Sequence, residues 1–257
     1  MASEKMARDA PRATQLIVAE IGKFYKRPDV NAHLAPSRPT PRTVGNAKAA
    51  IYAFYDYDEE PIYVGQTQEG VSARVGRHLT GQRSDAVAKF VLDPFEVAEI
   101  AVWTLHDVAN FELPSSEPGL TAEGRKKLLA KARKQLLDRY EAEVYSRLKA
   151  ESHFGAVLNE AVPVSDGNPV ILPEVARGKI IPEVLWDDRK HADIRIARRA
   201  NHVARLAQLI SEREPSNGLR RTLHLQAQRL EWLSNRRLDD LKIPQEYAEG
   251  EATEVED

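Results

Sequence analysis

The spacing of apolar residues along the first part of the chain predicts one helix followed by an irregular connection. Ile17, Ile21 and Phe24 recur at intervals of four and three residues, which is typical of the buried face of a helix, here over residues 8–26. Closely spaced prolines follow, and proline disfavours both helices and central strands. We therefore expect residues 1–47 to form a core-packing helix and an extended linker.

The next segment is rich in β-branched and aromatic side chains, which is typical of strands. Residues 50–56 and 62–64 predict two short strands joined by a tight acidic connection, and Gly65 ends the second strand. A buried stripe of valine and leucine predicts a helix over about residues 69–81. Residues 95–105 predict a third strand.

A long helix is expected over residues 122–150, with Thr121 as its N-cap. Its apolar stripe includes Leu137 and Val144, and Glu141 lies on the same stripe. A carboxylate in a buried seam costs free energy unless it is paired, hydrogen-bonded or bound to a cation. Glu141 is therefore a candidate functional residue.

The second half of the chain predicts a connecting segment and a helical hairpin. Residues 161–189 are rich in proline and glycine, whereas residues 190–245 return to helical spacings that a break at 214–218 interrupts. The predicted outer face of the hairpin is basic and carries Arg195, Arg198, Arg199, Arg205, Arg220, Arg221, Arg229, Arg236 and Arg237. Two interpretations stay open: a solvated face on a packing or dimerisation module, and a face that contacts phosphate.

Composition and charge narrow the class of protein. The 257 residues have ordinary apolar and charged shares of 42% and 30%, and the net charge of −2 does not favour a general nucleic-acid binder. The chain has no cysteine, which excludes disulfides and cysteine nucleophiles and fits a cytoplasmic protein. No apolar run is long enough to span a membrane. Residues 246–257 hold six acidic side chains and no Lys or Arg, which is typical of a disordered tail; shielding of a basic site is the alternative.

Reactive side chains are densest between residues 49 and 78. Tyr52 and Tyr63 lie on predicted strands, and Arg74 and His78 are one turn apart on the predicted helix. A tyrosine accepts a proton when nearby cations lower its pKa, and arginine stabilises negative charge on a phosphoryl transition state. A single carboxylate can hold Mg²⁺ while water and phosphate complete its shell. Each residue alone is more often structural, but together they form the parts of a one-metal site that hydrolyses phosphodiesters.

The same residues resemble the motifs of the GIY-YIG nucleases. That family begins with Gly-Ile-Tyr, matched by Ala-Ile-Tyr at residues 50–52, and continues with Tyr-Ile-Gly or Tyr-Val-Gly, matched at residues 63–65. A helix then carries an arginine and, one turn later, a histidine or tyrosine, as Arg74 and His78 do. The resemblance covers residues 48–160 and implies an α+β domain with a small three-stranded antiparallel sheet flanked by helices.

Two further motif elements follow in order. Glu141 matches the family's metal-binding glutamate on a late helix, and Asn159 matches its closing asparagine. Tyr145 and Ser146 depart from the pattern, since an aliphatic and a basic residue are common there, so Glu143 is the alternative ligand. The resemblance implies that Glu141 binds Mg²⁺ or Mn²⁺ and that Asn159 braces Glu141 or another site residue.

The resemblance also implies roles for the other site residues. Tyr52 would be the general base that activates the attacking water, directly or through another water, and Tyr63 would hold the phosphate or the nucleophile. Arg74 would bind the scissile phosphate and stabilise the developing charge. His78 would orient water or assist proton transfer.

We therefore expect a metal-dependent DNA endonuclease of the cytoplasm, acting in restriction or phage defence or in DNA repair or recombination. The arginines expected to contact DNA are Arg77, Arg83, Arg198 and Arg199. The C-terminal hairpin would grip DNA or form a homodimer. The alternatives are a non-catalytic DNA- or protein-binding module on a nuclease scaffold, and an interaction protein built on the hairpin.

Overall fold

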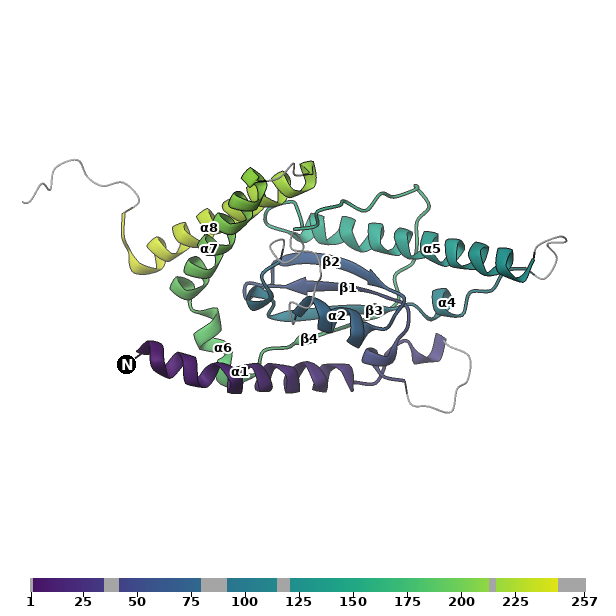
Figure 1. Ribbon diagram of the computed structural model, residues 1–257, viewed down its shortest axis with the longest axis horizontal. Coiled ribbons are helices and arrows are strands. Elements are labelled where there is room, and N and C mark those ends of the chain that lie inside the picture. Colours follow the sequence, from purple (N-terminus) through teal and green to yellow (C-terminus); the bar gives the residue numbers. More distant parts are fainter. Residues whose placement is uncertain (1, 35–41, 80–91, 115–120, 213–215, 245–257) are drawn as a thin grey trace, which may run out of the picture.

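A four-stranded antiparallel sheet forms the centre of the molecule, with helices on both of its faces (Figure 1). This computed structural model describes residues 2–34, 42–79, 92–114, 121–212 and 216–244. The architecture is α+β, in agreement with the sequence prediction. None of the helices in these ranges is both long and apolar enough to cross a bilayer.

The sheet has the strand order β2-β1-β3-β4, and every neighbouring pair is antiparallel. Its strands are β1 (Ala50–Tyr55), β2 (Pro61–Thr67), β3 (Glu99–Thr104) and β4 (Val175–Lys179). All six residues of β1 are buried, because the strand lies in the middle of the sheet and is covered on both faces. This explains why its sequence is a continuous apolar and aromatic run rather than an alternating one.

The prediction of three strands is wrong by one, because β4 comes from the segment expected to be only a connection. Its sequence, Val-Ala-Arg-Gly-Lys, has no alternation of apolar and polar residues, and only Ala176 is buried. The strand is held instead by its ladder with β3 and by Arg27, which donates from Nη1 to the carbonyl oxygen of Arg177 at 3.1 Å. Gly178 leaves room for that guanidinium, because a Cβ there would collide with it.

Two apolar clusters cover the two faces of the sheet. One face packs against α1 (Ala2–Tyr25) and α2 (Val71–Leu79), and the other against α4 (His106–Ala109) and α5 (Ala122–Glu151). Short 3-10 helices join these elements: η1 (Ala32–Leu34), η2 (Val44–Asn46) and η3 (Pro94–Glu96). The face that carries α2 also holds the tyrosines and the histidine of the candidate site.

The C-terminal part consists of α6 (Glu183–Lys190), α7 (Ala192–Glu212) and α8 (Asn217–Leu241). The helices α7 and α8 form a hairpin around a small apolar cluster that includes Leu206 and Leu219. Ser216 caps α8, since its side chain accepts a hydrogen bond from the backbone N–H of Leu219. Leu225 of α8 also joins the core on the α2 face of the sheet, so the hairpin packs onto the sheet. The predicted acidic tail lies outside the described residues.

A buried ionic cluster fastens α7 to the sheet. Glu96 of η3 is 4% exposed and accepts hydrogen bonds from three arginines. Arg195 Nε and Arg199 Nη2 lie 3.1 and 2.9 Å from its Oε2 atom, and Arg198 Nη2 lies 2.5 Å from Oε1. Burial alone would raise the pKa of Glu96, but the three guanidinium groups outweigh it and hold that pKa below its ordinary value.

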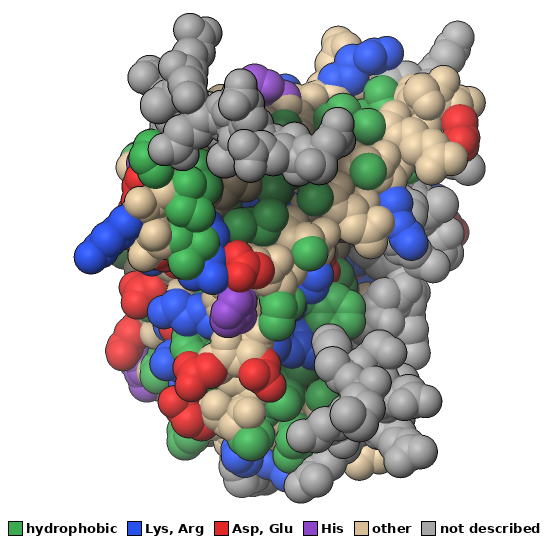
Figure 2. Space-filling model, turned by 90° about the vertical axis from the view of Figure 1, so that its left-hand side faces the viewer, with side chains coloured by type: hydrophobic (Ala, Val, Ile, Leu, Met, Phe, Trp, Pro, Cys, Tyr) green, Lys and Arg blue, Asp and Glu red, His purple; other side chains and the backbone are tan. Residues whose placement is uncertain are grey.

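The expected basic outer face is therefore wrong for Arg195, Arg199 and Arg229, which are all buried. Arg229 of α8 donates to the Glu60 carboxylate at 3.0 Å, next to the start of β2. The surface at the end of the molecule formed by α6, α7 and α8 carries acidic and basic side chains intermixed (Figure 2). The arginines are evident in the sequence, but their carboxylate partners lie 99 to 169 residues earlier in the chain and could not be assigned.

Candidate active site

Tyr52 and His78 form a buried hydrogen-bonded pair on the α2 face of the sheet. The Tyr52 hydroxyl lies 2.8 Å from His78 Nε2. Tyr52 is 0% exposed and His78 is 5% exposed. His78 lies on the inner face of α2 beside Val71 and Val75, which explains why it points at the sheet. The pair can pass a proton between the phenol and the imidazole, so both predicted proton-transfer residues are in contact.

Tyr63 lies beside this pair on β2. Its ring centroid is 5.1 Å from that of His78 and 6.3 Å from that of Tyr52, and it stacks on Phe54 at 5.8 Å. Unlike Tyr52, the Tyr63 side chain is only partly buried and lines a pocket. Tyr52 therefore lies beneath the surface, whereas Tyr63 lies at the surface of the pocket.

Gly65 is required by the packing of Tyr52. The register of β1 and β2 sets the two residues directly opposite each other. A Cβ on Gly65 would collide with the hydroxyl oxygen and ring of Tyr52. The glycine of the second motif therefore gives the backbone of β2 close access to the phenol, and it leaves the hydroxyl near the pocket that Gly65 lines.

Arg74 of α2 extends toward these tyrosines. Burial would lower the pKa of Arg74, but the charge of Tyr52 and a hydrogen bond with it outweigh this effect and raise the pKa above its ordinary value. The Nε atom of Arg74 is buried and has no hydrogen-bond partner among the described residues. The same holds for the Nε atoms of Arg133, Arg198, Arg199 and Arg229, so it is not particular to this pocket; an anionic ligand there would satisfy the Nε of Arg74.

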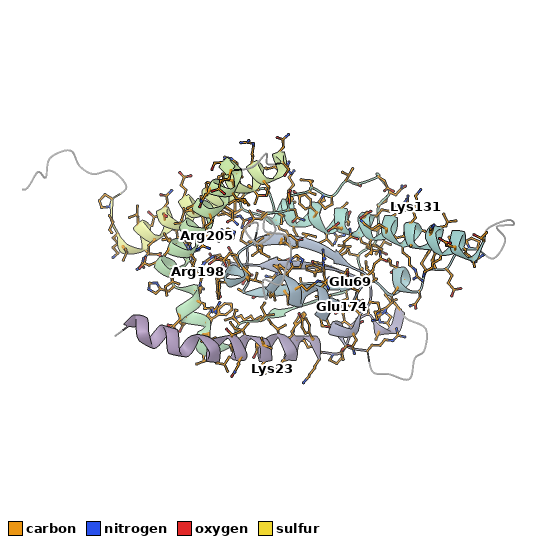
Figure 3. The ribbon with its side chains drawn as sticks, viewed as in Figure 1. Lys23, Glu69, Lys131, Glu174, Arg198 and Arg205 are labelled. Carbon is orange, nitrogen blue, oxygen red and sulfur yellow. The ribbon has the colours of Figure 1, made fainter. Side chains whose placement is uncertain are left out.

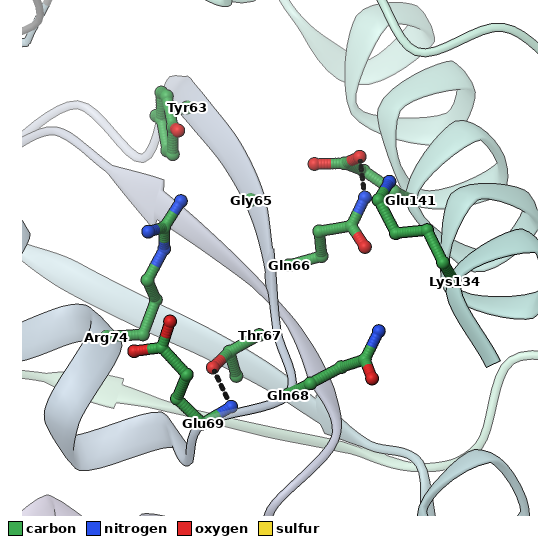
Figure 4. Close-up of a pocket in the computed structure, with 9 residues that line it drawn as sticks. All are labelled: Tyr63, Gly65, Gln66, Thr67, Gln68, Glu69, Arg74, Lys134 and Glu141. Atoms are coloured by element: carbon green, nitrogen blue, oxygen red, sulfur yellow. Dashed lines mark hydrogen bonds between the residues drawn. The ribbon is translucent and has the colours of Figure 1, made fainter. Parts of the chain in front are cut away.

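The pocket spans the edge of β2 and has a volume of about 420 Å³, which is in the range of small-molecule and cofactor sites. Its lining residues are Tyr63, Gly65, Gln66, Thr67, Gln68, Glu69, Arg74, Lys134 and Glu141. Figure 4 shows Arg74 reaching from α2 on one side of the strand, and Glu141 and Lys134 reaching from α5 on the other. Three of the predicted site residues, from three different elements, therefore share one cavity.

Glu141 is the carboxylate of α5 that borders the pocket. It lies between the fully buried Leu137 and Val144 on the helix. Burial raises the pKa of Glu141 above its ordinary value, while a hydrogen bond from Gln66 and the positive charge of Lys134 oppose the rise. A partly buried carboxylate beside a polar cavity fits a hard divalent cation such as Mg²⁺. Within the described ranges, no group of three or more acidic or histidine side chains is arranged as a metal site, so a cation here would share one glutamate with water and substrate.

Asn159 braces β2 and not Glu141. Its Oδ1 atom accepts from the backbone N–H of Val64 at 3.0 Å, and its Nδ2 atom donates to the Val64 carbonyl oxygen at 2.8 Å. Both bonds are buried. The asparagine thus satisfies the outer edge of β2 between Tyr63 and Gly65 and fixes the strand that carries both residues.

The four arginines predicted to contact DNA differ in their surroundings. Arg77 donates to Glu69 at the rim of the pocket, with 2.5 Å between Nη2 and Oε2. Arg83 lies outside the described residues. Arg198 lies well apart from Glu69, which lines the pocket (Figure 3). Arg198 and the buried Arg199 both form ion pairs with Glu96. Both arginines belong to the ionic cluster. Burial corrects the expected role of Arg199, whereas DNA contact by the partly exposed Arg198 stays a prediction.

Sequence reasoning missed three residues around Glu141: Gln66, Asp138 and Lys134. Gln66 directly follows the second motif, and the other two lie three and seven residues before Glu141 on the same helix face. The sequence shows that Lys134, Asp138 and Glu141 share one face of a helix. It does not show that this face contacts Gln66 of β2.

No family model describes the chain, and neither a curated protein nor a solved structure matches it. The resemblance to the GIY-YIG nucleases therefore rests on its sequence motifs, and the geometry of the pocket is a separate observation.

Proposed function

We propose that the protein is a metal-dependent DNA endonuclease that hydrolyses phosphodiester bonds at this pocket. The observation that carries the proposal is that Tyr63, Arg74 and Glu141 line one cavity directly beside the Tyr52–His78 pair. An arginine, a proton acceptor and a carboxylate that can ligate a metal are groups that promote the hydrolysis of a phosphodiester. They come from β1, β2, α2 and α5, so the fold rather than local sequence assembles them.

The proposed chemistry assigns one task to each side chain. Arg74 binds the scissile phosphate and stabilises the negative charge that grows on it in the transition state. Because Tyr52 is 0% exposed, it takes the proton of the attacking water through a bridging water, while its own proton moves to His78 Nε2 along their 2.8 Å hydrogen bond. Tyr63 orients the phosphate from the pocket wall. A divalent cation held by Glu141 would supply Lewis acidity at the phosphate oxygens.

A plasmid cleavage assay with a matched pair of variants tests the proposal. Supercoiled DNA is incubated with the protein and Mg²⁺ or with a chelator, using the wild type, Glu141→Ala and Glu143→Ala. Glu143 is the control because it lies on the same helix and pairs with Arg147 at 2.9 Å, away from the pocket lining. We expect cleavage by the wild type and Glu143→Ala with Mg²⁺, and none by Glu141→Ala. Tight DNA binding without any cleavage would refute the enzyme and favour a binding module.

A further inference from the structure

The side-chain amide of Gln66 connects β2 to α5 at the pocket. Its Nε2 atom lies 2.6 Å from Glu141 Oε2 and 2.8 Å from Asp138 Oδ1. Ionised carboxylates only accept hydrogen bonds, so the nitrogen end of the amide must face them and its orientation is fixed by chemistry. Both N–H bonds of the amide are used, one on each carboxylate.

Both ends of this connection are held in place. Gln66 lies in the ladder of β2 opposite Ile51, so its backbone is part of the sheet. On the helix, Asp138 and Glu141 are three residues apart on one face, and Lys134 forms an ion pair with Asp138. Figure 4 shows Gln66 reaching from the strand to Glu141, with Lys134 beside them on the helix. The ammonium group balances the second carboxylate, which lets two acidic residues share one amide.

The hydrogen bond acts on the carboxylate that the proposed metal requires. It occupies Oε2 and limits rotation of the group, which leaves Oε1 of Glu141 to face a ligand.

We propose that Gln66 is a positioning residue that presents one oxygen of Glu141 to a divalent cation, and that Asp138 holds the Gln66 amide in its turn. This inference rests on the proposed endonuclease function, because it assigns Glu141 the metal. Outer partners of metal ligands fix the orientation of those ligands, and their loss weakens metal binding about 10- to 100-fold.

Binding of Mn²⁺ to the full-length protein, measured by electron paramagnetic resonance, is the direct test. Gln66→Ala and Gln66→Met both lose the donor, and the methionine keeps the length of the side chain. We expect both variants to bind Mn²⁺ about 10-fold or more weakly than the wild type. Gln135→Ala is the control, since Gln135 is an exposed glutamine of α5 that does not line the pocket, and its Mn²⁺ affinity should not change.

Asp138 provides a second comparison. Asp138→Asn keeps an oxygen that accepts from Gln66, so it should bind Mn²⁺ nearly as the wild type does. Asp138→Ala loses that acceptor and should bind more weakly than Asp138→Asn. Circular dichroism establishes that each variant is folded. A purely structural connection between β2 and α5 would lower the unfolding temperature in Gln66→Met while leaving its Mn²⁺ affinity unchanged, and that result would overturn the inference.

Cleavage assays separate this inference from the proposed function. In Gln66→Met, the Mn²⁺ concentration needed for half-maximal cleavage should rise while the rate at saturating Mn²⁺ recovers. A wild type that binds Mn²⁺ but cleaves no DNA would refute the endonuclease alone. A wild type that cleaves DNA and a Gln66→Met variant with unchanged Mn²⁺ affinity would refute the role of Gln66 alone. A wild type that binds no Mn²⁺, with or without DNA, would overturn the role of Gln66.

Discussion

Removal of the Glu96 carboxylate should loosen the C-terminal hairpin. Glu96 is 4% exposed and accepts hydrogen bonds from three guanidinium groups of α7 at distances of 2.5 to 3.1 Å, and it shares their countercharge with Asp56 and Asp58. Breaking a buried ion pair from one side leaves uncompensated buried charge and costs about 3–5 kcal/mol. We therefore expect Glu96→Ala to lower the free energy of unfolding by about this amount. Glu96→Gln keeps an acceptor oxygen and should lose less.

Urea denaturation followed by circular dichroism measures this loss, and limited proteolysis of the native protein shows whether α7 and α8 are released. Arg236→Ala is the matched control, because Arg236 is paired with Asp58 but its side chain is 48% exposed. An exposed pair of this kind contributes less than about 1 kcal/mol. A loss below about 1 kcal/mol in Glu96→Ala, together with an unchanged protease pattern, would refute the role given to the cluster.

Acid should act on the same cluster in a predictable direction. The pKa of Glu96 is lowered in the folded protein, so its contribution to stability is complete above the unfolded pKa of about 4.3. The contribution is lost as pH falls through the folded pKa. Glu96→Gln should therefore flatten the acid side of the stability curve, and an acid limb as steep as that of the wild type would contradict the assignment.

Three further predictions concern the site. Gly65→Ala should lower the stability by about 1–3 kcal/mol and remove most of the cleavage activity, because the new methyl group collides with Tyr52. A thermal melt and a plasmid assay measure the two effects, and a variant as stable and as active as the wild type would contradict this prediction. Asn159→Ala should cost about 1–3 kcal/mol for each Val64 backbone group left unsatisfied, measured by urea unfolding; a neutral effect would show that β2 does not need this brace. The raised pKa of Glu141 predicts that Mn²⁺ affinity falls with decreasing pH around a midpoint above about 4.3, and a midpoint at or below that value in a pH titration would contradict it.

The parts of the fold that follow from local pattern could be predicted from the sequence. The apolar run of β1, the buried stripe of α2 and the long helix α5 all lie where the pattern of apolar residues predicted them. The strand β4 could not be predicted, because an edge strand such as Val-Ala-Arg-Gly-Lys is held by its ladder and not by an apolar face. Its pairing partner is more than seventy residues away in the chain.

Polar partners were harder to predict than polar residues. Arg74, His78 and Glu141 could be selected because their residue types and helical spacings limit where they point. The burial of Arg199 could not be predicted. Its side chain would face solvent in an isolated helix, and it is buried here because it pairs with Glu96. The contact between Gln66 and Glu141 likewise depends on how β2 and α5 cross, which no local pattern specifies.

The central claim is that the Tyr52–His78 pair and Arg74 perform phosphodiester hydrolysis. Single-turnover cleavage of a mixed DNA library with Mg²⁺, with the product ends mapped and DNA affinity measured separately, tests it most directly. Tyr55→Phe is the control for Tyr52→Phe, because Tyr55 lies on the same strand but in the cluster on the α5 face. We predict that Tyr52→Phe and Arg74→Ala bind DNA but cleave about 10²- to 10⁴-fold more slowly, while Tyr55→Phe cleaves as the wild type does. Equal cleavage rates for Tyr52→Phe, Arg74→Ala and the wild type would contradict the account.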